Sequence, residues 1–220
     1  MYPLPILDRK TVVAPLFGDA LRGPPHVFDF SSGNPQVMQY DPAHFPEFQR
    51  KVYEVLRESG KTWGIGRYFE ERRTMLRHFP QMIQEERIYH VGVDITSLPG
   101  TSLFAPLDAE VFSVGKEEGL GNYGGFVILR HGKDEDVFYS FYGHLQSHHS
   151  VREGQRIVAG EKFAVIGDGE DSGGWFTHTH LQIITEEARR QGRMFHGYVG
   201  AGDLPLLEKL FPSPYPLFRY

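Results

Sequence analysis

Cysteine is absent from this chain of 220 residues. Disulfide bonds, zinc sites built from thiolates and a cysteine nucleophile are therefore excluded. The chain also lacks a strong charge of one sign, because 23 Lys and Arg stand against 28 Asp and Glu and leave a formal net charge of −5. Nothing in this balance indicates a nucleic acid or an anionic membrane surface as a partner.

Long apolar runs are missing as well. No stretch is long enough to span a bilayer. The first residues, Met1–Asp8, lack the basic region of a secretory signal and are interrupted by Pro3 and Pro5. As the sequence stands we expect a cytoplasmic protein, with an exported form still open if a leader has been trimmed. What is present is ordinary for a globular protein, since 40% of the residues are hydrophobic and 23% are charged.

Three parts can be distinguished along the chain. Residues 1–87 are expected to form a Pro-rich and helical extension. Within it, Asp41 is expected to cap a helix that opens at Pro42 and ends at Gly60. Residues 61–87 are basic and aromatic, and we interpret them as a solvated helix face, with a substrate-binding role as the alternative. The side chains concerned include Arg67, Tyr68, Arg72, Arg73, Arg77 and His78.

Residues 88–185 form the second part. Short runs rich in Val, Ile, Phe and Tyr alternate there with glycine turns, which is typical of an antiparallel β-sandwich or barrel. Residues 186–220, the third part, are expected to add a helix around Asp203–Phe211 and a tail packed on this core. The predicted fold class is therefore mainly β, with an N-terminal extension that contains α-helix.

Two possible metal ligands occur four residues apart in the motif His90-Val-Gly-Val-Asp94. The valines, and the Pro99-Gly100 turn that follows, favour a strand. Alternate side chains of a strand share a face, so His90 and Asp94 would point into a cleft, with Gly92 between them leaving room for an ion. An imidazole and a carboxylate are both ligands that zinc accepts.

A second motif, His178-Thr-His180-Leu, places two imidazoles on one face of a strand. One of them can complete a set of three ligands with the first motif. Three ligands leave the open coordination position that separates a catalytic zinc from a structural one. The other imidazole then stands beside the metal without binding it. A third motif, Tyr142-Gly-His144-Leu, ends an aromatic strand and supplies one more imidazole, so two remain free to move protons.

Together with Arg130-His131-Gly132, these motifs resemble those of the lysostaphin/LytM-type zinc metalloendopeptidases, a family that hydrolyses peptidoglycan. The resemblance covers residues 88–185. It implies an antiparallel β-core, the duplicated hybrid motif, and Zn²⁺ as the cofactor.

The resemblance also implies a role for each polar residue of the motifs, namely zinc ligation by His90, Asp94 and His180, and catalysis by His144 and His178. The implied reaction is hydrolysis of peptide bonds in peptidoglycan-type or Gly-containing peptides. One catalytic imidazole would accept a proton from the attacking water and the other would stabilise the oxyanion. Both assignments of these two roles remain open.

Three further side chains are candidates for the site. His131 is expected to support the site from behind the ligands. Tyr142 and Tyr123 could donate to the oxyanion, although packing within a strand is the preferred interpretation for both. Residues 1–87 could lie over the cleft as a latch, or form one of its walls.

Alternative functions are also considered. The chain could be a catalytically silent LytM-like module that binds a partner or regulates other hydrolases, with residues 1–87 occluding the cleft. The presence of all five motif residues argues against that loss. Asp171-Ser172-Gly173-Gly174 resembles the nucleophile segment of trypsin-like proteases, but a turn explains it more simply. Histidine phosphocarrier domains share the hybrid-motif architecture, and Asp94 counts against their function here.

Overall fold

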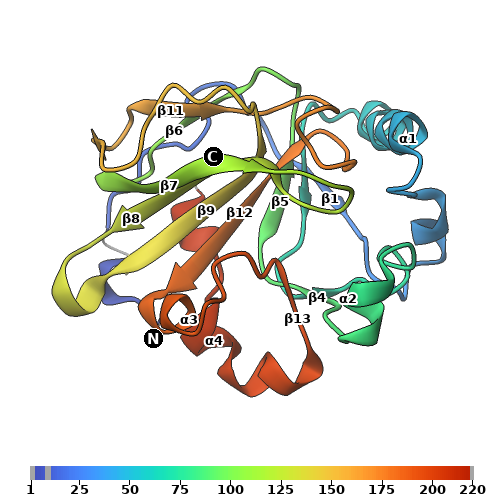
Figure 1. The fold of residues 1–220 in the computed structure, drawn as a ribbon. Coiled ribbons are helices and arrows are strands. Elements are labelled where there is room, and N and C mark those ends of the chain that lie inside the picture. Colours follow the sequence, from blue (N-terminus) through green and yellow to red (C-terminus); the bar gives the residue numbers. More distant parts are fainter. Residues whose placement is uncertain (1–2, 8–10, 219–220) are drawn as a thin grey trace.

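A large open β-sheet dominates the computed structural model, which describes residues 3–7 and 11–218 (Figure 1). The expectation for Met1–Asp8 therefore lies partly outside the described residues. The eight strands of the sheet follow the order β1-β2-β5-β12-β9-β8-β7-β10. Every neighbouring pair is antiparallel except β1 and β2. The predicted class, mainly β with an antiparallel core, is confirmed, and the sheet is not closed into a barrel.

The strands of the large sheet come from every third of the chain. They are β1 (His26–Phe28), β2 (Gly64–Gly66), β5 (Val93–Thr96), β7 (Ala109–Glu117), β8 (Gly124–His131), β9 (Phe138–Leu145), β10 (Arg156–Ile157) and β12 (His178–Thr185). Two smaller sheets pair β6 (Ser102–Phe104) with β11 (Lys162–Val165), and β4 (Tyr89–His90) with β3 (Glu70–Glu71) and β13 (Tyr198–Val199).

The helices are short and lie around the sheet (Figure 1). The α-helices are α1 (Phe45–Glu58), α2 (Pro80–Gln84), α3 (Glu186–Arg190) and α4 (Leu207–Leu210), and the 3₁₀ turns are η1 (Pro5–Leu7), η2 (Pro35–Gln39), η3 (Asp134–Asp136), η4 (Ala201–Leu206) and η5 (Tyr215–Leu217). Consecutive η4 and α4 occupy the region in which a C-terminal helix was expected. Among the described residues, no helix combines the length and the apolar character that crossing a bilayer requires.

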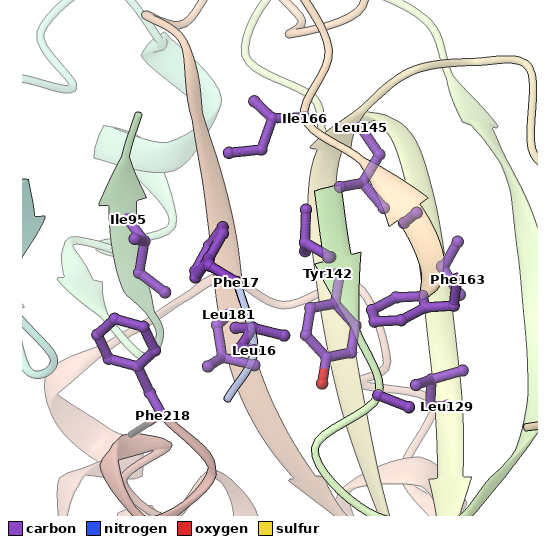
Figure 2. Packing of buried hydrophobic residues seen from close by; sticks show 14 of the residues in the cluster. Leu16, Phe17, Ile95, Leu129, Tyr142, Leu145, Phe163, Ile166, Leu181 and Phe218 are labelled. Carbon is purple, nitrogen blue, oxygen red and sulfur yellow. The ribbon is translucent and has the colours of Figure 1, made fainter. Parts of the chain in front are cut away.

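Apolar side chains fill both faces of the sheet, which explains why β9 is buried along its whole length. On one face, Tyr142 of β9 lies beside Phe163 of β11, and Leu181 of β12 belongs to the same cluster (Figure 2). The rings of Tyr142 and Phe163 lie 4.8 Å apart. On the other face, Phe141 and Ile184 pack with α3 and α4. Successive strand residues alternate between faces, so Tyr142 and Phe141 belong to opposite layers.

The N-terminal extension adds strands to the large sheet and packs a cluster of its own beside it. Its strand β2 pairs with β5, and β1 pairs with β2. Phe30, Phe48 and Trp175 belong to an aromatic cluster that joins the extension to the loop before β12. The rings of Phe48 and Phe176 lie 5.0 Å apart in this cluster.

Helix α1 starts three residues later than Pro42. Asp41 does accept a local hydrogen bond, from the backbone N–H of Ala43 at 2.9 Å, but it closes a turn that precedes the helix. The helix itself begins at Phe45 with a proline in its first turn, and Gly60 follows its end with a φ of +66°. The predicted end is therefore confirmed. The predicted start was wrong because Pro42 and Pro46 are both suited to the first turn of a helix, and it is the second of them that lies in the first turn of α1.

The interpretation of residues 61–87 as a solvated helix face was also wrong. The segment contains β2, β3, a series of turns and the five-residue helix α2. Arg72 is only 1% exposed, and Glu70 is 5% exposed. A run of charges was taken as surface, whereas two of them pair with each other inside the protein.

Candidate metal centre

Three side chains from three strands converge on a single point. His90 comes from β4, Asp94 from β5 and His180 from β12, and each is 3% exposed or less. His90 Nε2 lies 3.0 Å from His180 Nδ1. Asp94 Oδ1 lies 3.2 Å from each of these nitrogens. The three residues predicted as ligands thus form one compact donor set.

The size of this triangle fits a zinc ion. Tetrahedral zinc with bonds of about 2.0–2.2 Å separates its ligand atoms by roughly 3.3–3.6 Å. The observed separations of 3.0–3.2 Å differ from this by a few tenths of an ångström. Two imidazoles and one carboxylate also match the donor types of catalytic zinc sites. The residues present therefore fit the metal.

Outer hydrogen bonds set which nitrogen of each ligand faces the metal. His90 Nδ1 donates to the carbonyl of Arg67 at 3.1 Å, which leaves Nε2 free as a ligand. His180 Nε2 donates to Gln182 Oε1 at 3.0 Å, which leaves Nδ1 free. The amide of Gln182 is oriented in turn, because its nitrogen donates to the carbonyl of His196 at 3.1 Å. Such outer partners fix the tautomer of ligating histidines.

The motif His90–Asp94 is not one continuous strand. Strand β4 ends at His90, the chain bends at Gly92, and β5 begins at Val93 in the other sheet. A Cβ at Gly92 would overlap the ring of His180. Glycine was expected to leave room for an ion, but in the structure it leaves room for the third ligand.

His144 and His178 stand next to the donor set, as the sequence predicted for the catalytic pair. Their rings lie 4.2 Å apart, and His178 Nε2 lies 3.5 Å from Asp94 Oδ1. His178 Nδ1 donates to the carbonyl of Phe176 at 2.6 Å, and His144 Nδ1 donates to that of Ser172 at 2.9 Å. Each ring therefore keeps its Nε2 free of a proton.

A β-bulge turns His144 into the site. Gly125 pairs with Leu145 while Val127 pairs with Tyr142, so β9 holds one residue more than β8 over this stretch. His144 has a φ of +59°, in the left-handed region. Regular alternation would have placed it on the Tyr142 face. Bulges next to active sites commonly re-aim a side chain in this way.

Burial governs the protonation of these groups. Burial lowers the pKa of His178 to about 4 and that of His90 to about 3, with the charge of Arg72 as the next cause for His90. Burial also lowers the pKa of His144 well below its ordinary value. Burial raises the pKa of Asp94, but the electrostatic interactions with His90 and Arg72 outweigh burial and hold this pKa well below the usual range. His90, His144 and His178 are therefore neutral beside the ionised carboxylate of Asp94.

Of the three remaining candidates, Tyr123 lies at the site, whereas Tyr142 and His131 do not. The ring of Tyr123 lies 5.2 Å from that of His180 and 5.8 Å from that of His144, so Tyr123 belongs to the site. Burial raises the pKa of Tyr123 well above its ordinary value, which keeps its hydroxyl protonated. Tyr142 faces the opposite layer of the sheet (Figure 2).

His131 is not brought to the site either. It occupies the far end of β8, where Nδ1 donates to the carbonyl of Asp108 and Nε2 accepts from the Ser140 hydroxyl at 2.7 Å. It pairs with Phe138, five residues along β9 from Gly143, whereas His180 pairs with Gly143 itself. His131 therefore lies away from the ligands, because it is on β8 opposite one end of β9, whereas His180 is on β12 opposite the other end of β9.

Sequence reasoning missed two residues that touch the donor set. Arg72 Nη1 donates to Asp94 Oδ2 at 2.6 Å. The ring of Tyr198 lies 5.2 Å from that of His90, and its hydroxyl accepts from Arg72 at 3.4 Å. Neither residue belongs to the three motifs. The one signal for Arg72 was its place in a charge-dense run, which equally describes a surface.

The donor set lies in a cavity of about 390 Å³. One wall is the stretch from His78 to Met82, at the start of α2. The loop from Leu120 to Tyr123 forms a second part of the lining, and Phe195, Gly197 and Tyr198 form a third. Leu120 and Phe195 are 57% and 40% exposed, so apolar groups mark the rim. The N-terminal extension thus contributes a wall to the cleft.

Ser172 does not have the environment of a nucleophile. Its hydroxyl donates to the carbonyls of Trp175, at 2.6 Å, and Gly169, at 3.2 Å, and the residue is 1% exposed. The contact of Ser172 with the site is made by its backbone carbonyl, which accepts from His144. The turn interpretation of this segment agrees with these contacts.

Comparison with known proteins points to the same part of the chain. Residues 88–192 match the family model described as Peptidase family M23. An uncharacterized metalloprotease of Haemophilus influenzae is 35% identical over 94 residues, a match that covers 43% of this chain and 18% of that protein. This chain therefore aligns with less than a fifth of its relative's length.

Two solved structures are also similar. A zinc-containing peptidase from Vibrio cholerae is 24% identical with a TM-score of 0.38, covering 44% of this chain and 28% of that one. The catalytic domain of the antimicrobial peptidase lysostaphin from Staphylococcus simulans is 20% identical with a TM-score of 0.40, covering 55% and 80%. The resemblance to the lysostaphin/LytM-type metallopeptidases is confirmed, with residues 88–192 as the part of the chain that matches Peptidase family M23.

Proposed function

We propose that this protein is a zinc-dependent metalloendopeptidase. One observation carries the proposal: His90, Asp94 and His180 present three ligand atoms within 3.2 Å of one another at a cavity, with two more imidazoles beside them. The match to Peptidase family M23 supports hydrolysis of peptide bonds as the reaction. Peptidoglycan-type or Gly-containing peptides are the proposed substrates, following the motif resemblance.

Zinc bound by the three ligands would supply a Lewis acid and a water molecule that loses its proton near neutral pH. The chain's own residues then handle the proton. The Nε2 atoms of His144 and His178 carry no proton, because each ring already donates through Nδ1. Either ring can accept a proton from water, and the ring that becomes protonated can later donate to the leaving amine. The backbone carbonyls of Phe176 and Ser172 hold both rings in orientation.

Tyr123 is proposed to donate to the oxygen of the scissile carbonyl. Its hydroxyl stays protonated because burial raises its pKa, and its oxygen lies against Gly197, where a Cβ would overlap it. The phenol therefore lies between Gly197 and the ring of His180 in the lining of the cavity. A preorganised donor at the site of developing negative charge is a large contributor to acyl-transfer catalysis.

The test combines metal content with hydrolysis. We expect one zinc per chain and cleavage of a glycine-rich fluorogenic peptide or of purified peptidoglycan fragments. His90→Ala and Asp94→Ala should lose the metal. His144→Ala and His178→Ala should keep it and lose about 10²–10⁴-fold in turnover.

The outcomes separate two functions. Zinc bound stoichiometrically without cleavage of either substrate would favour the silent LytM-like binding or regulatory module. Stoichiometric zinc in the Asp94→Ala variant would contradict the ligand set itself.

A further inference from the structure

The short segment Gly64–Arg72 lies along both halves of the first metal motif. As β2 it pairs with β5, with Gly66 opposite Asp94. As β3 it pairs with β4, with Glu70 opposite His90. This segment precedes residues 88–192, so it is not part of the region that matches the peptidase family. The metal motif is therefore flanked by structure from outside its own domain match.

Two residues of this segment bond to proposed ligands, Arg67 through its backbone carbonyl to His90 and Arg72 through its side chain to Asp94. Arg72 Nη1 donates to Asp94 Oδ2 at 2.6 Å and its Nε donates to Glu70 Oε2 at 2.9 Å, with the side chain 1% exposed. Because Oδ2 is held in this way, Oδ1 is the oxygen that faces His90 and His180. One oxygen of Asp94 thus accepts from the guanidinium of Arg72, and the other faces the two proposed histidine ligands.

An aromatic ring and a glycine surround the guanidinium of Arg72, whose Nη2 has no hydrogen-bond partner among the described residues. Its Cζ lies 5.2 Å from the centroid of the Phe30 ring, a cation–π distance. Gly66 provides the space, because a Cβ there would lie 3.0 Å from Nη2. Glu70, which orients Arg72, is itself held by Arg67 at 3.0 Å and by the backbone N–H of Phe30 at 3.2 Å.

We propose that Arg72 is a positioning residue of the metal centre, which holds Asp94 so that a single carboxylate oxygen ligates zinc. The inference rests on the proposed zinc site. A planar guanidinium with two N–H groups in fixed directions can bond Asp94 and Glu70 together, whereas an ammonium is a single point charge on a flexible stem. Outer partners of metal ligands typically change metal affinity about 10–100-fold.

A structural role alone makes a different prediction. A buried ion pair that only supports the fold would change unfolding of the metal-free chain and leave the metal's affinity and coordination as they were. The measurement must therefore read the metal directly. Zinc affinity by competition with a chromogenic chelator does so, and the visible absorption of the Co²⁺-substituted chain reports coordination number.

The experiment compares the full-length chain with Arg72→Met. We expect zinc affinity to fall about 10–100-fold. We also expect the Co²⁺ absorption to weaken, as the freed carboxylate binds through both oxygens and raises the coordination number. Arg73→Met is the matched control, since Arg73 is the next residue, its side chain is 46% exposed, and its partners Glu71 and Glu86 lie at the surface. It should bind both metals as the parent does.

Arg72→Lys keeps the buried charge and decides the question if the Met variant does not fold. Its zinc affinity should fall between those of the parent and Arg72→Met, and be at least about fivefold below the parent. A folded Lys or Met variant with parental zinc affinity and a parental Co²⁺ spectrum would overturn the inference. If the parent itself binds no zinc, it is the proposed function that fails, which is a separate result.

Discussion

Replacing Gly92 by alanine tests the geometry of the metal centre most directly. The new Cβ would meet Cε1, Nε2 and Nδ1 of His180, and it would lie 2.9 Å from Nδ1, the proposed ligand atom. The closest contact would be with Cε1, at 2.3 Å, and ordinary contact begins at 3.4 Å, so the ring or the backbone must move by about 1.1 Å. Metal–ligand distances tolerate only about ±0.2 Å.

Two quantities should therefore change in Gly92→Ala. Zinc affinity should fall by about 100-fold or more, because the required displacement exceeds what the site tolerates. The metal-free chain should lose about 1–3 kcal/mol of unfolding free energy, the usual effect of overpacking. For a chain of this size that corresponds to a decrease in Tm of roughly 2–12 °C.

Gly202→Ala is the matched control, because a Cβ there meets nothing within 4 Å and the residue is exposed. It should change stability by less than about 0.5 kcal/mol and leave zinc affinity unchanged. The measurements are chelator competition and thermal unfolding with and without zinc. Parental zinc affinity in folded Gly92→Ala would refute the placement of His180 against this glycine.

Further predictions concern residues that the structure removes from the chemistry. Burial lowers the pKa of His131 from an ordinary 6.5 to about 4, so between these pH values the unfolded chain binds a proton that the folded chain does not, and the free energy of unfolding falls as pH drops from 6.5 to 4. Chemical denaturation should show that the parent loses up to about 3 kcal/mol more unfolding free energy over this range than His131→Gln does. The same dependence of unfolding free energy on pH in both proteins would contradict this. Tyr142→Phe should keep peptide hydrolysis within about twofold, since its hydroxyl lies in the opposite layer of the sheet, and a large drop in kcat would return Tyr142 to the site. Ser172→Ala should also remain active, because the backbone carbonyl of residue 172 still accepts from His144. Only two hydrogen bonds of the hydroxyl are lost, each worth about 1 kcal/mol. Complete inactivation of a folded variant would support Ser172 as a nucleophile.

Much of the site could be predicted from the sequence because strand periodicity determines which side chains share a face. In β12 the alternation holds, and it places His178, His180 and Gln182 together as expected. The ligand set also follows from residue type, since only a few side chains bind zinc. Short motifs carry this information locally.

What failed depends on interactions between distant segments. The bulge that turns His144 arises from the pairing of β9 with β8, and Tyr142-Gly-His144-Leu by itself shows no sign of it. The bend at Gly92 exists because β4 and β5 join different sheets. Arg72 looked like a surface charge because its partner Asp94 is 22 residues away in sequence.

The pairing of Gly64–Arg72 with both β4 and β5 has a consequence for anyone who trims this chain. A fragment cut to residues 88–192 would remove β3 and β13, the two neighbours of β4, and would also remove β2 from β5. Unpaired strand edges are templates for association with other chains. Such a fragment should aggregate on expression, so the boundaries suggested by similarity alone are too narrow for a well-behaved recombinant protein.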